Sequence, residues 1–255
     1  MALEVQNRGW LGSGRDQTEA GRYNNLRAAR AWRVQSPVLW LKFAAKREEV
    51  RVFAKRFPRG CGERPSLWEK PQKAGTLLPV GKDLDPRVNE ALLFHGTSPQ
   101  LVLSILETGF NERFAGNSAG TAFGCGVYLA DDAGKSDQYV SCDRKLDPSS
   151  EVHQAFYRGK QTPNGEKVEH PENVFYLFLC RAVLGFVVPY TSSPSVFQSA
   201  ERKELIPIPG TSPRVHHHSL VVHPGSTVQR YREIVITHGE RVYPEYLIAF
   251  KRDRI

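Results

Sequence analysis

Cysteine is scarce in this sequence, and no two cysteines lie close together. The 255 residues include one methionine and four cysteines, which are Cys61, Cys125, Cys142 and Cys180. Cysteines at this spacing form no CxxC metal knuckle, and four are too few for the disulfide framework of a chain this long. Few and widely spaced cysteines are typical of proteins in a reducing compartment, so we expect an intracellular protein of the nucleus or the cytoplasm.

Long apolar runs are also missing. The opening residues, MALEVQNRGWLGSG, lack the apolar core of a signal peptide, and no unbroken apolar run is long enough to span a bilayer. We therefore expect no membrane partner. A GxGxxG segment between a strand and a helix is absent as well, which argues against a Rossmann-type dinucleotide site.

Acidic residues are few only in the first third of the chain. Residues 1–80 hold 16 Lys and Arg against 7 Asp and Glu, a balance of +9, whereas residues 81–255 hold 19 against 20, a balance of −1. Residues 1–30 are polar and show little periodicity, so we expect a loosely ordered basic extension. We expect residues 31–255 to fold as one domain, and removal of residues 1–30 to leave its chemistry intact.

A basic helix is predicted over residues 37–57. Ser36 and Pro37 supply an N-cap and a first-turn proline, and large apolar residues recur at near-helical spacing until Pro58. The outer face of this helix carries Lys42, Lys46, Arg47, Arg51, Lys55 and Arg56. Such a face is either a solvated surface or a contact for nucleic acid or another polyanion, and the sequence leaves both open.

The most informative stretch is residues 92–140, LLFHGTSPQLVLSILETGFNERFAGNSAGTAFGCGVYLADDAGKSDQYV. A short apolar strand ends in the sequence HGT, and Ser98 with Pro99 begins a helix that Gly109 ends. A polar, glycine-containing loop over residues 111–121 leads to a second short strand. The glycines beside this strand let a ligand or another chain segment approach the backbone closely.

The side chains of this stretch suit a flat aromatic ligand. Tyr128 and Tyr139 offer ring faces, while Ser136 and the backbone of Gly96 offer directional hydrogen bonds. Taken singly, a tyrosine on a strand is more often structural, and a histidine such as His95 is more often a satisfied hydrogen bonder. The grouping therefore indicates a binding site without deciding its function.

The C-terminal half is predicted to be rich in strands. Residues 141–171 are polar and indicate a surface insertion. Residues 173–188 are apolar and long enough for either one central strand or two strands that meet at Gly185. Residues 231–237 and 245–251 are expected to pair as a terminal hairpin.

One acidic residue stands out in the first of these last two strands. Alternation places Tyr231, Glu233 and Val235 on one face. Because an acid among β-branched neighbours is costly to bury, Glu233 lies either at an open edge or in a functional site.

Histidine clusters at His216, His217, His218 and His223, which raises the question of a metal. Consecutive residues of an extended segment point to alternate faces, and no carboxylate or cysteine is near in sequence. We therefore expect no metal at these histidines.

These motifs, in this order, resemble a known family. HGT, FGCGVYLAD and KSDQY resemble the NAD-binding signature of the poly(ADP-ribose) polymerases, and YREIVITHGERVYPEYLIAF is most similar to the tankyrase branch and its mono-transferase relatives. The resemblance covers residues 88–255. It implies an α+β, ADP-ribosyltransferase-like fold in which two antiparallel-rich sheets form an NAD cleft with flanking helices, so residues 31–255 become the catalytic domain.

The resemblance also implies the co-substrate and the roles of the site residues. NAD binds in the cleft, Tyr128 and Tyr139 sandwich its nicotinamide, and Arg113 in the polar loop meets the pyrophosphate. The expected NAD-binding residues are His95, Gly96, Tyr128, Ser136, Tyr139 and Arg113. The expected catalytic residues are Glu233, His95 and Tyr128. We expect Gly96→Val to block the space for the carboxamide without unfolding the protein.

Glu233 falls at the position of the family's catalytic glutamate, where many mono-transferase relatives carry an apolar residue. Nicotinamide leaves NAD as a neutral base, so the leaving group needs no proton and one carboxylate suffices, whereas ordinary glycosidases use two. The carboxylate stabilises an oxocarbenium-like transition state and orients the acceptor.

The implied reaction moves ADP-ribose from NAD to acceptor proteins, the chain itself among them, as single units or as polymer. Two other classes stay open. A non-catalytic NAD or ADP-ribose binding module is disfavoured by Glu233, and an enzyme that modifies nucleic-acid ends is favoured by the basic first third.

Tankyrases carry a Cys/His zinc site in the insertion that corresponds to residues 141–171. This segment offers only Cys142, His153 and His170 for such a site, so we expect no metal here either.

Overall fold

The computed structural model describes residues 3, 5, 7–13, 22–57, 83–112, 122–190, 196–198, 204–225 and 227–255. The predictions made for Cys61, for Arg113 and for most of the polar loop over residues 111–121 lie outside the described residues. None of the helices among the described residues is long and apolar enough to cross a membrane.

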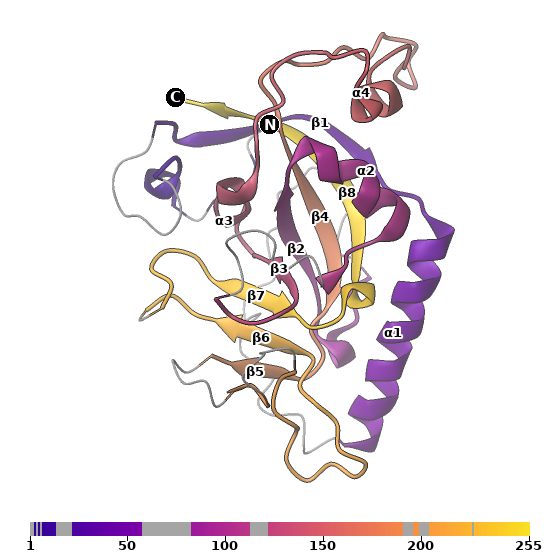
Figure 1. The fold of residues 1–255 in the computed structure, drawn as a ribbon, viewed down its shortest axis with the longest axis vertical. Helices are drawn as coiled ribbons and strands as arrows, with labels where there is room; N and C mark the ends of the chain where they lie inside the picture. Colours follow the sequence, from indigo (N-terminus) through magenta and orange to yellow (C-terminus); the bar gives the residue numbers. More distant parts are fainter. Residues whose placement is uncertain are drawn as a thin grey trace.

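Two four-stranded sheets make up the body of the protein (Figure 1). The first has the order β1-β8-β4-β2, with antiparallel neighbours throughout, and its strands span Asn25–Arg33, Val242–Asp253, Phe175–Val183 and Glu90–Thr97. The second has the order β3-β7-β6-β5, with one parallel pair, and its strands span Val127–Leu129, Glu233–Ile236, Ser219–Val222 and Val187–Pro189. The predicted α+β fold with two antiparallel-rich sheets is confirmed.

The main core lies between the two sheets. Phe178 and Leu247 of the first sheet and Ile234 and Ile236 of the second belong to one buried cluster. β4 is buried along its whole length, because it is central in its sheet and covered on both faces, which explains its unbroken apolar sequence. Of the two alternatives read from the sequence, the structure has two strands: the chain turns between β4 and β5 at Gly185, which has a positive φ of 58°.

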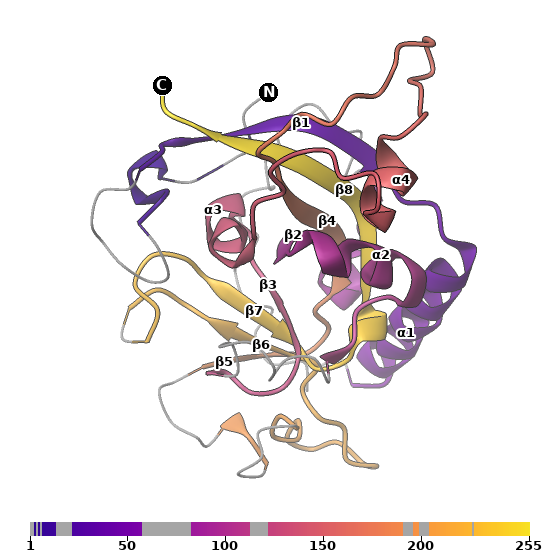
Figure 2. The same cartoon turned by 45° about the horizontal axis from the view of Figure 1, so that its top comes forward.

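Helices flank the sheets. α1 spans Pro37–Arg56 and α2 spans Pro99–Thr108, in agreement with the capping residues read from the sequence. Short helical segments complete the described elements: η1 Arg8–Trp10, η3 Pro86–Val88, α3 Ala133–Ser136, η5 Asp137–Tyr139, α4 Glu151–Phe156 and η7 Gly239–Arg241. α2 and α4 contact each other, and α2 also contacts β4 (Figure 2).

Several of the described N-terminal residues belong to the core. Leu3, Leu11 and Leu26 are buried in one cluster with Leu177 and Phe250. β1 begins at Asn25 and pairs with β8, so the expected boundary at residue 30 falls inside a strand. The prediction of a loose extension is wrong for these described residues, because their few apolar side chains are ordered by long-range contacts that leave no local periodicity.

The last two strands do not form a hairpin. β7 lies in the second sheet and β8 in the first, and η7 carries the chain from one to the other. Gly239 is required at this crossing, since a Cβ there would overlap the carbonyl oxygen of Phe110. Both strands have the apolar alternation of hairpin strands, and that local pattern carries no information about which sheet each strand joins.

Candidate active site

The two sheets meet where β2 ends beside β3. The amide of Phe94 donates to the carbonyl of Ala130 at 2.7 Å, and the amide of Ala130 donates back at 3.0 Å. This bridge brings the HGT motif of β2 next to Tyr128 of β3, although a helix and a loop separate them in sequence. The predicted site residues of the two motifs therefore share one location.

His95 is held by the backbone of the neighbouring strand. Its Nδ1 lies 2.9 Å from the carbonyl oxygen of Tyr128, and its ring packs edge-on against Phe110. Burial lowers the pKa of His95 below its usual value, which favours the neutral imidazole near pH 7. Because a carbonyl only accepts, Nδ1 carries the proton, and Nε2 keeps a lone pair that can accept a ligand hydroxyl.

Tyr128 has a fixed ring. Its hydroxyl donates to the carbonyl of Gly124 at 2.8 Å and accepts from the amide of Phe123 at 3.1 Å. Burial, with the nearby charge of Glu233 adding to it, raises the pKa of Tyr128 well above its usual value. The phenol therefore stays neutral, and its ring orientation is set before any ligand arrives.

Glu233 is buried and ion-paired. Its Oε1 lies 2.7 Å from Nζ of Lys135, and the two side chains are 7% and 3% exposed. Glu233 pairs with Val222 of β6, Val235 pairs with Tyr128 of β3, and Val222 and Val235 belong to the same buried cluster. The predicted face assignment is thus confirmed, and Glu233 and Tyr128 lie on one face of the second sheet.

Two arginines close to Glu233 in the sequence bind other groups. Arg232 binds Asp131 with nitrogen to oxygen distances of 3.0 and 2.5 Å. Arg241 lies 3.4 Å from the hydroxyl of Thr237, and burial lowers its pKa to about 10. Lys135 was not among the predicted site residues. Two signals pointed to it: it is a lysine among small residues beside Ser136, and a buried acid such as Glu233 needs a cation.

The KSDQY motif lies beside Glu233. α3 carries Lys135 and Ser136, both buried, and η5 carries Tyr139, whose side chain is 37% exposed. Nζ of Lys135 lies 5.3 Å from the centre of the Tyr139 ring. Lys135 therefore contacts both the buried acid and a partly exposed aromatic ring.

Comparison with known proteins identifies the family of the chain. A family model described as the poly(ADP-ribose) polymerase catalytic domain matches residues 13–252. The chain belongs to this family. Members of the family use NAD as a co-substrate.

Two curated relatives are mono-ADP-ribosyltransferases named PARP11. The mouse and human proteins are each 26% identical over 175 residues, which is 65% of this chain and 43% and 42% of theirs. The mouse mono-ADP-ribosyltransferase PARP10 is 30% identical over 135 residues, 53% of this chain and 10% of its own length. The chain thus spans less than half of these relatives. The particular likeness to the tankyrase branch stays a prediction.

Gly96, part of the poly(ADP-ribose) polymerase signature here, is a close-packing position. A Cβ at residue 96 would overlap the carbonyl oxygen of Ser136 and crowd Val140. Residue 96 must therefore be glycine for β2 and α3 to pack against each other. The expectation that Gly96→Val spares the fold fails on this geometry, because the larger side chain displaces α3 before any ligand is considered.

The segment that carries Ser136 and Tyr139 is anchored by the buried carboxylate of Asp137. Arg252 of β8 donates to this carboxylate at 2.8 Å and to the backbone carbonyl of Asp137 at 2.7 Å. Tyr23 donates a short hydrogen bond to the same side chain. Residues near both ends of the chain thus fix one wall of the site.

The N-terminal segment also supports β7. Nη1 of Arg230 donates to the carbonyl oxygen of Trp10 at 2.6 Å. The Trp10 ring packs edge-on against Tyr231, with ring centres 5.5 Å apart. Because Tyr231 lies two residues before Glu233, these contacts place residues 7–13 behind the acid.

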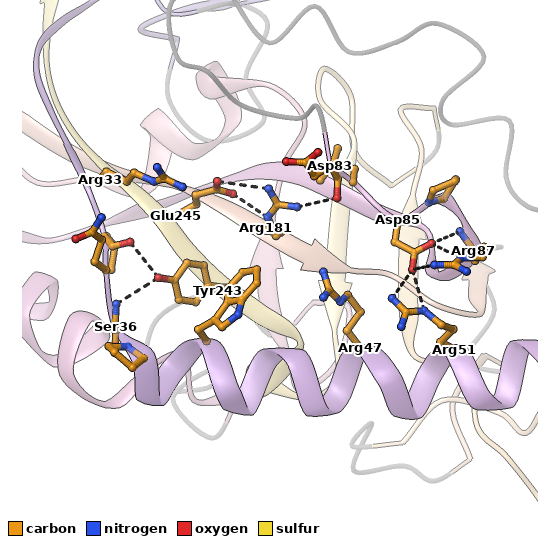
Figure 3. Close-up of a pocket in the computed structure, with 16 residues that line it drawn as sticks. Arg33, Ser36, Arg47, Arg51, Asp83, Asp85, Arg87, Arg181, Tyr243 and Glu245 are labelled. Atoms are coloured by element: carbon orange, nitrogen blue, oxygen red, sulfur yellow. Dashed lines mark hydrogen bonds and ion pairs between the residues drawn. The ribbon is translucent and has the colours of Figure 1, made fainter.

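A large cavity of about 1070 Å³ lies elsewhere, along α1 (Figure 3). None of the predicted site residues lines it. Arg181 on its wall pairs with Glu245 at 2.9 Å, so Glu245, the other acid near the C-terminus, is engaged in the first sheet and away from Tyr128. Arg51 reaches Asp85 at 2.7 Å across the same cavity.

The clustered histidines bond to separate backbone groups. Nδ1 of His216 lies 2.8 Å from the carbonyl of Leu205, and Nδ1 of His217 lies 2.8 Å from that of Ile206. His218 accepts from the amide of Phe186 at 3.2 Å. Each of these imidazoles therefore has its own structural contact.

Proposed function

We propose that this chain cleaves NAD, releases nicotinamide and transfers ADP-ribose to a protein acceptor. The observation that carries the proposal is Glu233, a buried carboxylate that shares a sheet face with Tyr128 and is held by Lys135 beside Tyr139. A folded binding module has no need of this acid, and burying it is costly without its partner.

The carboxylate acts on the ribose next to nicotinamide. As the bond to nicotinamide breaks, positive charge develops on the ribose, and a fixed anion stabilises this transition state more than the ground state. The contact with Lys135 holds the carboxylate in one place, so little reorganisation is needed during the reaction. Glu233 also accepts a proton from, or orients, the incoming acceptor.

The remaining residues bind and orient NAD in this proposal. Nε2 of His95 accepts from a hydroxyl of the adenine-side ribose, since its Nδ1 is committed to the Tyr128 carbonyl. The Tyr128 and Tyr139 rings stack on nicotinamide, and Gly96 and Ser136 bind its carboxamide. Arg113 as the pyrophosphate contact stays a prediction.

The product is a single ADP-ribose unit on protein, self-modification included. The names of the relatives support this choice, because each is a mono-ADP-ribosyltransferase. Glu233 does not by itself imply polymer, since chain growth also needs a site for the acceptor ADP-ribose. A discrete mass increase on the acceptor supports single transfer, whereas a ladder of products contradicts it.

A polyanion partner for α1 has weaker support than its sequence suggested. Lys46 pairs with Glu49, Arg47 lies 3.6 Å from Glu90, and Arg51 contacts both Glu48 and Asp85. These acids neutralise much of the helix's basic face. Gel shifts with short oligonucleotides at two salt concentrations test the point, because phosphate contacts weaken steeply with salt.

The decisive experiment is incubation of the folded chain with NAD labelled in its adenine-side half. Label on protein together with free nicotinamide is the expected result. Folded protein that binds NAD but releases no nicotinamide would favour the non-catalytic binding module. Label on added oligonucleotide and not on protein would favour the nucleic-acid enzyme.

A further inference from the structure

We propose that the insertion between η5 and β4 contains a divalent metal site, with Asp143, His153 and His170 as ligands and Zn²⁺ as the ion. One ligand atom from each lies within 4.8 Å of the others. All three side chains are buried, with exposed fractions of 8%, 4% and 1%. This proposal replaces our sequence-based expectation of no metal, which considered Cys142 and the two histidines but overlooked Asp143.

The three side chains converge on one carboxylate oxygen. Nε2 of His153 lies 2.7 Å from Oδ2 of Asp143, and Nε2 of His170 lies 3.1 Å from it. In a tetrahedral zinc site, ligand atoms about 2.0–2.2 Å from the ion are roughly 3.4 Å from one another. The observed separations are shorter than that value by about 0.7 Å for His153 and about 0.3 Å for His170, so both imidazoles must move away from the carboxylate to admit an ion.

His170 gives the independent observation that points to a ligand. Oδ2 of Asp143 already accepts hydrogen bonds from His153 and from the hydroxyl of Tyr176, at 2.7 and 2.8 Å. Nε2 of His170 is buried and, although it lies 3.1 Å from Oδ2 of Asp143, it forms no hydrogen bond within the described part of the chain. Leaving a buried polar atom unpaired is costly, and a cation between the three groups satisfies it.

Zinc binding determines where the imidazole protons lie. A neutral imidazole that ligates through Nε2 carries its proton on Nδ1. The amide of Asp147 donates to Nδ1 of His153 at 2.7 Å, so this contact must open before the carbonyl of Asp147, 3.1 Å from Nδ1, accepts that proton in the manner usual for zinc-bound histidine. For His170, the 3.1 Å contact from the Glu172 amide to Nδ1 must open. That amide belongs to an exposed turn in which Glu172 and Asn173 both have positive φ.

Neighbouring side chains hold the proposed ligands in place. The hydroxyl of Tyr176 orients the Asp143 carboxylate and lies 3.0 Å from the hydroxyl of Tyr157, whose ring packs edge-on against His170. No cysteine is involved: Cys142 is exposed, and its sulfur lies 4.0 Å from the side chain of Asn173. Two nitrogens and one oxygen from protein suit a borderline ion such as Zn²⁺, with water in a fourth position.

The ion would tie three parts of the insertion together. Asp143 bridges to the residue before β4, His153 lies on α4, and His170 lies just ahead of β4. Because Asp143 follows Tyr139 by only four residues, the same ion also restrains the segment that leaves the candidate active site.

The test measures zinc on the full chain without using NAD. Protein stripped with EDTA is reloaded with ZnCl₂ and dialysed, and bound zinc is measured by elemental analysis with the melting temperature alongside. We expect about one zinc ion per chain and a melting temperature several degrees higher than that of the stripped protein. Wild-type protein that retains no zinc overturns the proposal.

Variants locate the ion. Asp143→Asn and His170→Gln should lose the bound zinc and its thermal shift, whereas His216→Gln, which removes an imidazole from the other histidine group, should keep both. Equal zinc on His170→Gln and wild type overturns the assignment. Should the buried variants fail to fold, X-ray absorption of zinc-loaded wild-type protein decides: nitrogen and oxygen neighbours alone support the site, and sulfur scattering excludes it.

Discussion

Nζ of Lys135 lies 2.7 Å from Oε1 of Glu233, and both side chains are almost fully buried. The two residues come from different motifs and different elements, α3 and β7. Their ion pair joins the proposed nicotinamide wall to the proposed catalytic strand. The first two predictions follow from this contact.

Glu233→Gln should lower ADP-ribosyl transfer by about 10²–10³-fold, the usual effect of removing one preorganised electrostatic group. NAD affinity should change much less, because the ground-state ribose carries little positive charge. Single-turnover transfer and equilibrium NAD binding measure the two effects separately. Glu240→Gln, an exposed acid on the same segment, is the matched control and should behave as wild type. A Glu233→Gln variant that melts earlier yet transfers at the normal rate contradicts the assignment.

Lys135→Met should destabilise the fold strongly, by about 3 kcal/mol or more, because it leaves the Glu233 carboxylate buried without its cation. Adding Glu233→Gln to this variant should restore part of the loss, since the unpaired charge is then gone. Urea unfolding of the single and double variants measures this coupling. Lys46→Met breaks an exposed pair of similar length and should cost below about 1 kcal/mol. Strictly additive losses in the buried pair would argue against a direct interaction.

Asp137→Asn should weaken NAD binding roughly tenfold, an effect of positioning, since a displacement of Ser136 and Tyr139 by about 1 Å is costly. The pair with Arg252 is the relevant contact. KM should rise more than kcat falls, and Asp137→Glu should recover part of the binding. Asp253→Asn, which breaks the exposed pair with Arg27, is the control for losing a surface ion pair. An unchanged KM in a folded Asp137→Asn protein would contradict the anchoring role.

Removal of residues 1–30 should abolish cooperative folding, contrary to what the charge distribution suggested. The deletion removes Leu3, Leu11 and Leu26 from one buried cluster, along with part of β1. Leu11→Ala tests the same contact mildly and should cost about 2–5 kcal/mol of unfolding free energy. Circular dichroism melts of both proteins provide the measurement. A truncated protein that melts like the full chain would show that these contacts add little.

The stability of the fold should fall as the pH drops below about 6.5, the usual pKa of histidine. Burial lowers the folded-state pKa of His95 and of His218, so below about 6.5 the unfolded chain binds protons that the folded chain does not. Their contribution is therefore present above that pH and is lost as the pH falls. Unfolding free energies measured from about pH 7.5 to about pH 5 should show this slope, and His95→Gln should reduce it. An unchanged slope in that variant would mean that His95 titrates normally.

Much of the local structure could be read from the sequence alone. Ser36 with Pro37 and Ser98 with Pro99 predicted where α1 and α2 begin, because capping and proline preferences act within one turn. Alternation predicted the face on which Glu233 lies. The motif order predicted the family and the two-sheet fold, which the family match and the strand pairing confirm.

Only the tertiary structure decided which distant residues meet. Lys135 pairs with Glu233, and His153 and His170 converge on Asp143, although the residues in each group are separated in the chain. The tertiary structure also places β7 and β8 in different sheets. Composition and periodicity describe neighbours along the chain, whereas these contacts depend on how the two sheets stack and cross. The described N-terminal residues are a further example, since pairing with β8 and burial order a segment whose own sequence shows no apolar periodicity.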